Sequence, residues 1–308
     1  MNAASISTLG LVGFGEAARA LASGIRSASP EQQVIAIDPS FEAGPTTTLL
    51  REKAQELQIH IGESASSLSD CEVILSLVTP ALALAVAQPY ANQHAAGQIY
   101  VDLNSTDPAT KRQIAQLFES SSVDDVVDGV LTGAGIKLSG PQIPISLAGP
   151  RAGETEQVLT QLGLNVTSLG DKVGAAAALK MIRGVVMKGL EALVVEAILA
   201  GEHFGVADAV VDSVATSLDS ASGEDLVLML ATTHLVHCRR RAGEAAMIEA
   251  TVGQAGLESL MASATRAFFE RSCSTDIDSE FGGVVPDEFR PGIQRLAELL
   301  GSSDWRSA

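Results

Sequence analysis

Two glycines and an alanine near the N-terminus have the types and spacing of a nucleotide-binding turn. Gly13, Gly15 and Ala18 follow an apolar run at residues 6–13 and precede an alanine-rich stretch that reaches about residue 27. In the pattern G-x-G-x-x-G/A, the first glycine makes a tight turn, the second lets a pyrophosphate approach the backbone, and the third small residue lets helix pack on strand. The pyrophosphate then lies against the free N–H groups at the start of the helix. The residues predicted to bind a dinucleotide here are Gly13, Phe14, Gly15, Glu16, Ala17 and Ala18.

Asp38 is the second candidate in this part of the chain. It ends an apolar run at residues 34–37 that reads as a strand. A carboxylate about 20 residues beyond the glycines can accept hydrogen bonds from the ribose hydroxyls of NAD and would repel the 2′-phosphate of NADP. Asp38 therefore favours NAD over NADP as the cofactor, with NADP still open. A turn-forming aspartate before Pro39 is the alternative interpretation.

Polar residues also follow the next two predicted strands, at residues 73–78 and 99–103. Thr79 and Pro80 come after the first, and Asn104, Ser105 and Thr106 come after the second. Ligands of open α/β sheets bind at the carboxyl ends of the strands. The second group either contacts a ligand at this edge of the sheet or caps the helix that follows it. In the capping interpretation the N-cap residue is Thr106 or Asp107.

Lys180 is the candidate for acid and base chemistry. It lies in a stretch from Asp171 to about Gly201 that has no proline and is predicted to be one long helix. Gly184, Lys188 and Glu191 share its face by three-and-four spacing, and this polar stripe is either a site or a solvated edge. The charges within the stretch argue against a membrane span.

The elements that must position these residues alternate between strand and helix from residue 6 to residue 170. Strands are predicted at 123–131, 143–148 and 164–169, and this pattern is typical of a doubly wound parallel sheet of the Rossmann type. After residue 171 the pattern is helical, with segments at 206–218, 223–240, 242–255 and 258–271. The tail past Phe281 is rich in proline, serine and glycine, and no helix is predicted there. The fold class is therefore α/β followed by an all-α part. We expect a dinucleotide-binding domain at 1–170 and a helical substrate and dimerisation domain at 171–308, joined by one long helix.

Composition limits the partners. The chain has 308 residues and a formal net charge of −17, which disfavours nucleic acid and anionic membranes and leaves a small molecule as the expected substrate. No signal-peptide pattern opens the sequence, so a cytoplasmic location is expected. Cys71, Cys238 and Cys273 have no metal-binding or redox spacing, and His234 with His237 reads as an ordinary surface pair. No metal site is expected.

Four motifs together resemble the β-hydroxyacid dehydrogenase superfamily, which includes 3-hydroxyisobutyrate and 6-phosphogluconate dehydrogenases. They are LGLVGFGEAA, DLNSTDP, VDGVLTGA and VGAAAALKMIRG, in the order and spacing of that group. The resemblance covers residues 6 to 200. The C-terminal part, with HLVHCRRRAGEAAMIEATVGQAGLESLM, is similar to a divergent branch whose C-terminal domain is of unknown function.

The resemblance implies an NAD(P)-dependent dehydrogenase or reductase that acts on a CH–OH group of a small hydroxy acid, a β-hydroxy acid or a sugar acid. Lys180 would be the general acid and base, and desolvation by its apolar neighbours would favour the neutral amine that this role needs. Thr132, Gly133 and Ala134 match the loop that holds the substrate carboxylate. Asn104 and Ser105 would line the nicotinamide and substrate side, and Val78, Thr79 and Pro80 the adenosine side.

Departures from the family pattern concentrate around the substrate. Gly184 stands where the family has an asparagine, and Arg183 would supply a cationic anchor for an acidic or phosphorylated substrate unless it is a surface arginine. Thr132 and Ala134 alter the carboxylate loop. The family's lysine in the C-terminal domain has no clear counterpart here, and His237, Arg240 and Arg241 are the candidates to replace it.

Two other functions stay open at this point. Relatives on this scaffold reduce imines, and an inactive NAD(P)-binding scaffold or sensor is compatible with the altered substrate residues. The apolar character of the helical half predicts a homodimer in which the partner's C-terminal helices close the cleft.

Overall fold

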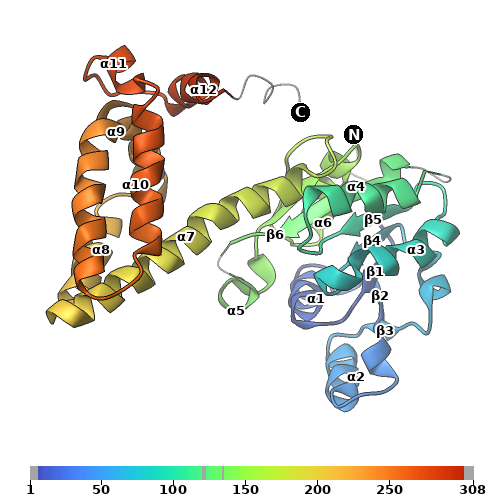
Figure 1. Ribbon diagram of the computed structural model, residues 1–308. Helices are drawn as coiled ribbons and strands as arrows, with labels where there is room; N and C mark the ends of the chain where they lie inside the picture. Colours follow the sequence, from blue (N-terminus) through green and yellow to red (C-terminus); the bar gives the residue numbers. More distant parts are fainter. Residues whose placement is uncertain (1–5, 120–122, 134, 302–308) are drawn as a thin grey trace. The chain divides into compact units, whose positions relative to one another are not determined.

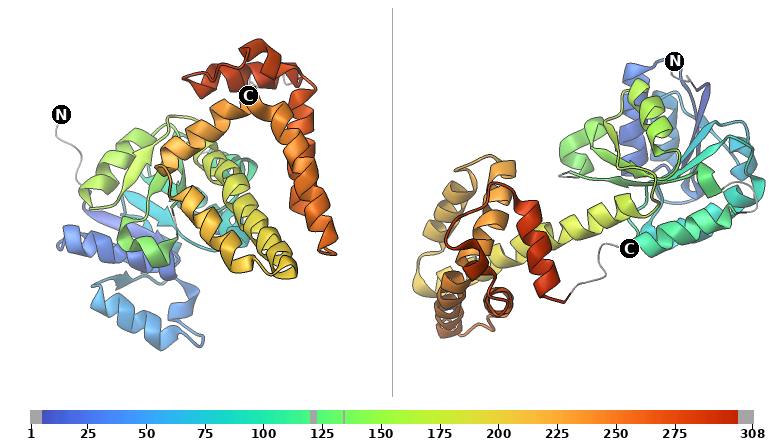
Figure 2. Two further views of the ribbon diagram at one scale, coloured as in Figure 1. Left: turned by 90° about the vertical axis from the view of Figure 1, so that its left-hand side faces the viewer. Right: turned by 90° about the horizontal axis from the view of Figure 1, so that it is seen from above.

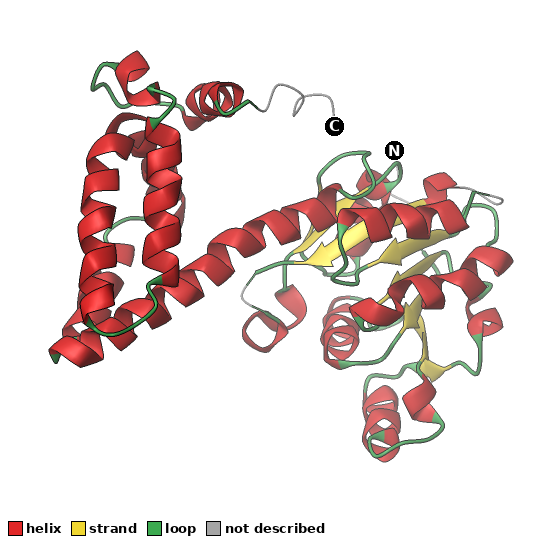
Figure 3. Ribbon diagram, viewed as in Figure 1, coloured by secondary structure: helices red, strands yellow, loops and turns green. Residues whose placement is uncertain are grey.

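The computed structural model describes residues 6–119, 123–133 and 135–301, and they form two compact units, Met1–Val185 and Val186–Ala308. Strands lie in the first unit, and the described part of the second is helical, with loops between the helices (Figure 3). The boundary falls inside the long helix α7 (Ala175–Phe204), C-terminal to the predicted boundary at 170/171. The early turns of α7, which carry Lys180, therefore belong to the first unit.

The described part of the first unit is built on one eight-stranded sheet with the order β3-β2-β1-β4-β5-β6-β7-β8 (Figure 1). Because the chain leaves β1 for β2 and β3 on one side and returns to β4 on the other, the order reverses between β1 and β4. In open α/β sheets this reversal is where a ligand-binding crevice opens. The strands are β1 (Thr8–Val12), β2 (Gln33–Ile37), β3 (His60–Ile61), β4 (Val73–Ser76), β5 (Ile99–Asp102), β6 (Val126–Leu131), β7 (Ile145–Ala148) and β8 (Val166–Ser168).

One pair of strands departs from the predicted parallel arrangement. β6 and β7 run antiparallel, with Asp128 opposite Ala148 and Leu131 opposite Ile145, whereas the other paired strands are parallel. The described residues of the connection between β6 and β7 contain the short helix α5 (Ile136–Ser139) and a 3-10 turn and no longer helix. A parallel return needs a longer crossover, usually with a full helix. The sheet is therefore mostly parallel.

Helices cover both faces of the sheet, as the burial of neighbouring strand residues shows. Leu75 packs in a core cluster with Ile25 and Val158, from two helices on one face. Ile74 packs in the cluster of the other face with Ala87 and Ile114. Both faces of the central strands are thus buried, which explains their continuous apolar sequences. The helices are α1 (Glu16–Ala28), α2 (Thr47–Glu56), α3 (Ala83–Gln93), α4 (Pro108–Leu117), α5 and α6 (Ala152–Gln161).

The second unit contains the C-terminal half of α7, α8 (Ala207–Leu218), α9 (Gly223–Gln254), α10 (Leu260–Cys273), α11 (Ile277–Phe281) and α12 (Phe289–Leu299). Helices α9 and α10 lie side by side (Figures 1 and 2). Its buried apolar clusters are small: Leu235, Cys238, Cys273, Ile277 and Leu296 in one, and Ala200, Val252 and Ala262 in the other. Within the described ranges, no helix combines the length and apolar character needed to span a membrane.

Three local predictions in the helical parts are wrong. The predicted helices at 223–240 and 242–255 are one continuous helix, α9, which passes through Gly243 because a glycine weakens a helix interior without necessarily ending it. The tail past Phe281 contains α12, in which Pro291 lies in the first turn, where proline is compatible with a helix. His234 is buried, and its ring Nε2 lies 3.0 Å from the Ser272 hydroxyl oxygen, so it is not a surface residue.

Candidate functional site

The glycine turn has the geometry that its sequence predicts. Gly13 has φ of +90°, and a Cβ there would lie 2.5 Å from the Leu77 carbonyl oxygen, so only glycine fits. At Gly15, which precedes α1, an added Cβ would meet no atom within 4 Å. No side chain caps α1. The turn thus offers open space and a helix N-terminus, the two features that a pyrophosphate requires.

A cavity of about 930 Å³ opens at this turn, over the carboxyl ends of β1, β2 and β4. Its size suits a cofactor or substrate. Three residues predicted to bind the cofactor do not line it: Phe14 and Ala18 are fully buried, and Asn104 is buried beneath the strand ends. The predicted cofactor residues that do line it are Gly13, Gly15, Glu16, Ala17, Asp38, Val78 and Thr79.

Asp38 forms the turn that the sequence offered as one interpretation, and it also lines the cavity. One carboxylate oxygen accepts a hydrogen bond from the Ser40 N–H at 2.8 Å, as a turn-forming aspartate does. The other accepts from the Phe14 N–H at 2.7 Å and so fixes the glycine turn to the end of β2. Because a carboxylate oxygen has two lone pairs, acceptor capacity remains toward the cavity that Asp38 lines.

Sequence reasoning missed three serines of the cavity wall. Ser40 follows β2, while Ser64 and Ser66 follow β3, and all three line the cavity. The signal was their place after strands of the parallel sheet, at the edge where ligands bind.

Lys180 and Ser105 meet, although 75 positions separate them in the chain. The Lys180 ammonium donates a hydrogen bond to the Ser105 hydroxyl oxygen over 2.5 Å. Burial, together with the positive charges of Lys111 and Arg183, holds the pKa of the Lys180 ammonium below its usual range. A lysine in such surroundings releases its proton more readily than a solvated one, which suits general acid and base chemistry.

Asn104 connects the Lys180 region to the cavity. Its side-chain oxygen accepts from the Val78 N–H at 2.7 Å, and its amide nitrogen donates to the Ser76 hydroxyl at 3.0 Å and to the Asp102 carboxylate. The helix-cap alternative belongs to Asp107 instead, which accepts from the first N–H groups of α4. Asn104 is thus buried, and its hydrogen bonds link the end of β4 to the end of β5.

The predicted substrate loop lies next to Arg183. The Arg183 guanidinium donates to the Gly133 carbonyl oxygen at 3.3 Å. The Thr132 hydroxyl and N–H both donate to the Pro144 carbonyl oxygen. Ala134 lies outside the described residues. At Gly184, one turn after Lys180, a Cβ would meet nothing within 4 Å, so the space beside Lys180 is open.

The C-terminal candidates have partners of their own within the second unit. Arg241 donates to the Thr233 hydroxyl at 2.9 Å, and Arg240 is paired with Glu244 on the same helix. His237 is half-buried on α9. Among the described residues, no group of three or more His, Cys, Asp or Glu side chains is placed to hold a metal ion.

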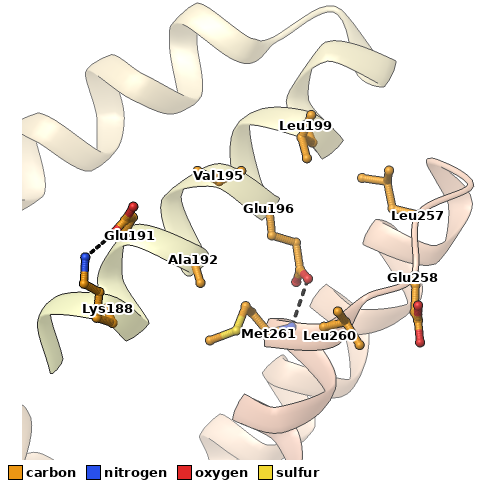
Figure 4. A pocket seen from close by; sticks show the side chains of 10 residues that line it. All are labelled: Lys188, Glu191, Ala192, Val195, Glu196, Leu199, Leu257, Glu258, Leu260 and Met261. Carbon is orange, nitrogen blue, oxygen red and sulfur yellow. Dashed lines mark hydrogen bonds and ion pairs between the residues drawn. The ribbon is translucent and has the colours of Figure 1, made fainter. Parts of the chain in front are cut away.

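A second cavity, of about 630 Å³, lies within the second unit between α7 and the start of α10 (Figure 4). Its wall is mostly apolar, with Val195, Leu199 and Leu260 among its residues. Glu196 points across it and accepts hydrogen bonds from the Met261 and Ala262 N–H groups at 2.9 and 2.8 Å, so its carboxylate caps α10. None of the predicted site residues lines this cavity.

Comparison with known proteins places the chain in a family. A domain of unknown function, DUF1932, matches residues 202–272. A conserved hypothetical protein from Sinorhizobium meliloti 1021 is 30% identical, over 96% of this chain and 98% of that one, with a TM-score of 0.60. The conserved protein MTH1747, whose structure is described as similar to 3-hydroxyacid dehydrogenases, is 27% identical, over 86% of this chain and 96% of that one, with a TM-score of 0.58. The protein belongs to the divergent branch of the β-hydroxyacid dehydrogenase-like family that carries DUF1932.

More distant members of this fold include characterised enzymes. An imine reductase from Myxococcus stipitatus in complex with NADP+ has a TM-score of 0.67 over 93% of this chain and 99% of that one, at 15% identity. At that identity the likeness shows the fold alone. The β-hydroxyacid dehydrogenase-like chain described here thus has the fold of NAD(P)-dependent oxidoreductases.

The two glycines of the turn make a matched pair for testing the site. Gly13→Ala should lower the free energy of unfolding by about 2 kcal/mol or more, because of its positive φ and the close Leu77 carbonyl. Gly15→Ala should cost less than about 1 kcal/mol but weaken NADH binding at least about tenfold, because its methyl group would occupy the space open to the pyrophosphate. Urea unfolding and NADH fluorescence titration measure the two effects. Unchanged NADH affinity in Gly15→Ala would show that no dinucleotide uses this turn.

Proposed function

We propose that the protein is an NAD-dependent oxidoreductase that transfers a hydride between the nicotinamide cofactor and the hydroxyl or carbonyl of a small hydroxy acid. The observation that carries the proposal is the 2.5 Å hydrogen bond between Lys180 and Ser105. Ser105 directly follows Asn104, which is bonded to Val78 in the wall of the dinucleotide cavity. Lys180 therefore lies at the same edge of the sheet as the glycine turn that is proposed to bind the cofactor.

In the proposed reaction the cofactor exchanges a hydride with the substrate, and the protein exchanges a proton with it. The oxidised nicotinamide supplies the hydride acceptor. Neutral Lys180 takes the proton of the substrate hydroxyl as the C–H hydride leaves, and returns it in the reverse direction. Since the pKa of Lys180 is lowered, the neutral amine needed for oxidation forms at lower pH than for a solvated lysine. Oxidation should accordingly rise with pH through that pKa.

Asp38 supports NAD as the cofactor of the proposed reaction. It lines the cavity at the end of β2, where a carboxylate accepts from ribose hydroxyls and repels a 2′-phosphate. Fold neighbours bind both forms: the Myxococcus stipitatus imine reductase is in complex with NADP+, and its V8 variant with NAD+. Cofactor form is thus tested directly, with NAD and NADP side by side.

Arg183 supports a substrate that carries an anionic group. The Thr132 hydroxyl and N–H are both taken by the Pro144 carbonyl, whereas the Arg183 guanidinium has one described contact, to Gly133, and five N–H donors in total. A guanidinium fork binds carboxylate or phosphate oxygens in pairs. We infer an acid with a second anionic group, such as a dicarboxylic or phosphorylated hydroxy acid, as the preferred substrate.

A homodimer is the proposed assembly. Large apolar side chains are exposed along α7 and α9 of the second unit, whose own buried clusters are small. Among them are Val186 at 63% exposure, Leu199 at 52% and Leu230 at 52%. Exposed apolar surface of this extent is typical of an interface.

Lys180→Met should lower turnover about 100- to 10,000-fold, because it removes the proton carrier, and should leave NADH binding within about twofold, since binding rests on the glycine turn. Steady-state absorbance of reduced nicotinamide and NADH fluorescence measure the two. Lys188→Met is the matched control, an exposed lysine on the same helix paired only with Glu191. Near-normal turnover in Lys180→Met would contradict the assignment.

A substrate panel tests reaction and specificity together. β-Hydroxy acids, sugar acids and their dicarboxylic or phosphorylated forms are assayed with NAD and with NADP, alongside cyclic imines with the reduced cofactors. Arg183→Gln should raise KM for the doubly anionic substrates at least about tenfold and change KM for monoacids by less than about threefold. Arg290→Gln, at an exposed arginine of α12, is the control. Turnover with imines alone would establish imine reduction instead, and NADH binding with a silent panel would point to a sensor.

Light scattering after size exclusion tests the assembly. The protein should elute with twice the mass of one chain, because burying the apolar faces of the second unit favours association. A double variant, Val186→Glu with Leu230→Glu, should shift it toward the monomer, whereas Lys53→Glu on the first unit should not. A monomeric wild-type mass would refute the dimer.

A further inference from the structure

A lysine that the proposed reaction does not use is buried in the first unit. Lys111, on α4, is 1% exposed. Its ammonium donates to the carbonyl oxygens of Asp102, at 2.6 Å, and Gly129, at 2.9 Å. It also forms ion pairs with the carboxylates of Asp102, at 2.8 Å, and Asp128, at 3.4 Å. Burying one ammonium and two carboxylates costs desolvation free energy. Apolar side chains of similar size in these three places would therefore stabilise the fold about equally well.

Asp128 connects Lys111 to the helix that carries Lys180. The second oxygen of the Asp128 carboxylate accepts hydrogen bonds from the N–H groups of Gly174, at 3.0 Å, and Ala177, at 3.1 Å. These are the otherwise unpaired donors at the start of α7. Lys180 comes one turn after Ala177, so the carboxylate that Lys111 holds also fixes the first turns of α7 to β6.

Asp102 connects Lys111 to the neighbourhood of Ser105. The Asp102 carboxylate that pairs with Lys111 also accepts from the side-chain amide of Asn104, the residue before Ser105. The other end of that amide is bonded to Val78. The Lys111 ammonium thus contacts two carboxylates. That of Asp102 holds the residue before Ser105, and that of Asp128 holds the start of the helix that carries Lys180.

We propose that Lys111 is a positioning residue, which ties the carboxyl ends of β5 and β6 together so that Ser105 and Lys180 meet in hydrogen-bonding geometry. The inference rests on the proposed function only in that Lys180 is taken as the proton carrier. Lys111 touches neither Ser105 nor Lys180 and acts through Asp102 and Asp128.

The charge of Lys111 adds a second effect on Lys180. The charged groups that act on Lys180 are Lys111 from α4 and Arg183 from α7, and both lower the pKa of its ammonium, after burial itself. Among the described residues, no carboxylate forms an ion pair with Lys180. A variant that keeps the net charge of the cluster formed by Lys111, Asp102 and Asp128 separates the position of Lys180 from the charge that acts on it, and this difference gives the test.

The variant that tests the proposal is Lys111→Met combined with Asp102→Asn. It removes one charge of each sign, and Asp128 keeps its two backbone donors, so no carboxylate is left without partners. Lys180 is titrated by NMR of 13C-methylated lysine side chains without substrate, with its signal assigned from Lys180→Met. Because the net charge of the cluster is unchanged and Lys180 loses its fixed, partly buried position, its pKa should rise toward that of a solvated lysine, by roughly half a unit or more relative to wild type. Lys53→Met, at an exposed lysine paired with Glu56, is the control and should leave it unchanged.

A second variant keeps the proposal testable if the first does not fold. Asp128→Asn keeps the shape of the side chain and loses its charge. Amide hydrogen exchange at Gly174 and Ala177 should quicken at least about tenfold, because a neutral amide oxygen holds their N–H groups less firmly than the carboxylate does. A folded double variant with the wild-type Lys180 titration, or a folded Asp128→Asn variant with wild-type exchange at both amides, would overturn the proposal. Because neither readout needs turnover, this result is independent of whether the protein is a dehydrogenase.

Discussion

The carboxyl ends of parallel strands meet at one edge of a sheet, and the candidate site depends on this constraint. The glycine turn follows β1, Asp38 follows β2, Thr79 comes shortly after β4 and Ser105 shortly after β5. Backbone hydrogen bonding between strands sets their spacing, so residues far apart in sequence reach one place without any direct contact of their own. Gly13, whose added Cβ would touch the Leu77 carbonyl, shows how closely the first turn lies against the neighbouring strand end.

Much of this was available from the sequence because it rests on local rules. The alternation of strand and helix to residue 170, the long helix through Lys180 and the glycine turn can all be recognised from periodicity, proline placement and the spacing of small residues. The antiparallel β7 could not be predicted from its own residues, because a buried strand has the same apolar pattern in either direction. Helix α9 is continuous across residues 240–242, where the sequence predicts two helices, because no proline interrupts it there and the glycine at 243 does not end it.

The site was predicted less completely than the fold. Residue types gave Lys180, Ser105 and Asp38, but the burial of Phe14, Ala18 and Asn104 depends on how the turn packs on the sheet. The serines after β2 and β3 carry no special spacing and become visible only once the strand order is known. Lys111 gave no signal, since a lysine in an amphipathic helix usually points to solvent. Its burial is a tertiary property, fixed by two aspartates on separate strands.

The position of the unit boundary has an evolutionary consequence. Lys180 and Arg183 precede Val185, where the first unit ends, although α7 continues to Phe204. The part of the helix that carries Lys180 is thus bonded to the sheet through Asp128, and it precedes the residues that match DUF1932. Substitutions accumulated in residues 202–272 can remodel that domain without displacing the lysine. Such an arrangement lets the sequence of the C-terminal domain change while the contact between Lys180 and Ser105 stays in place.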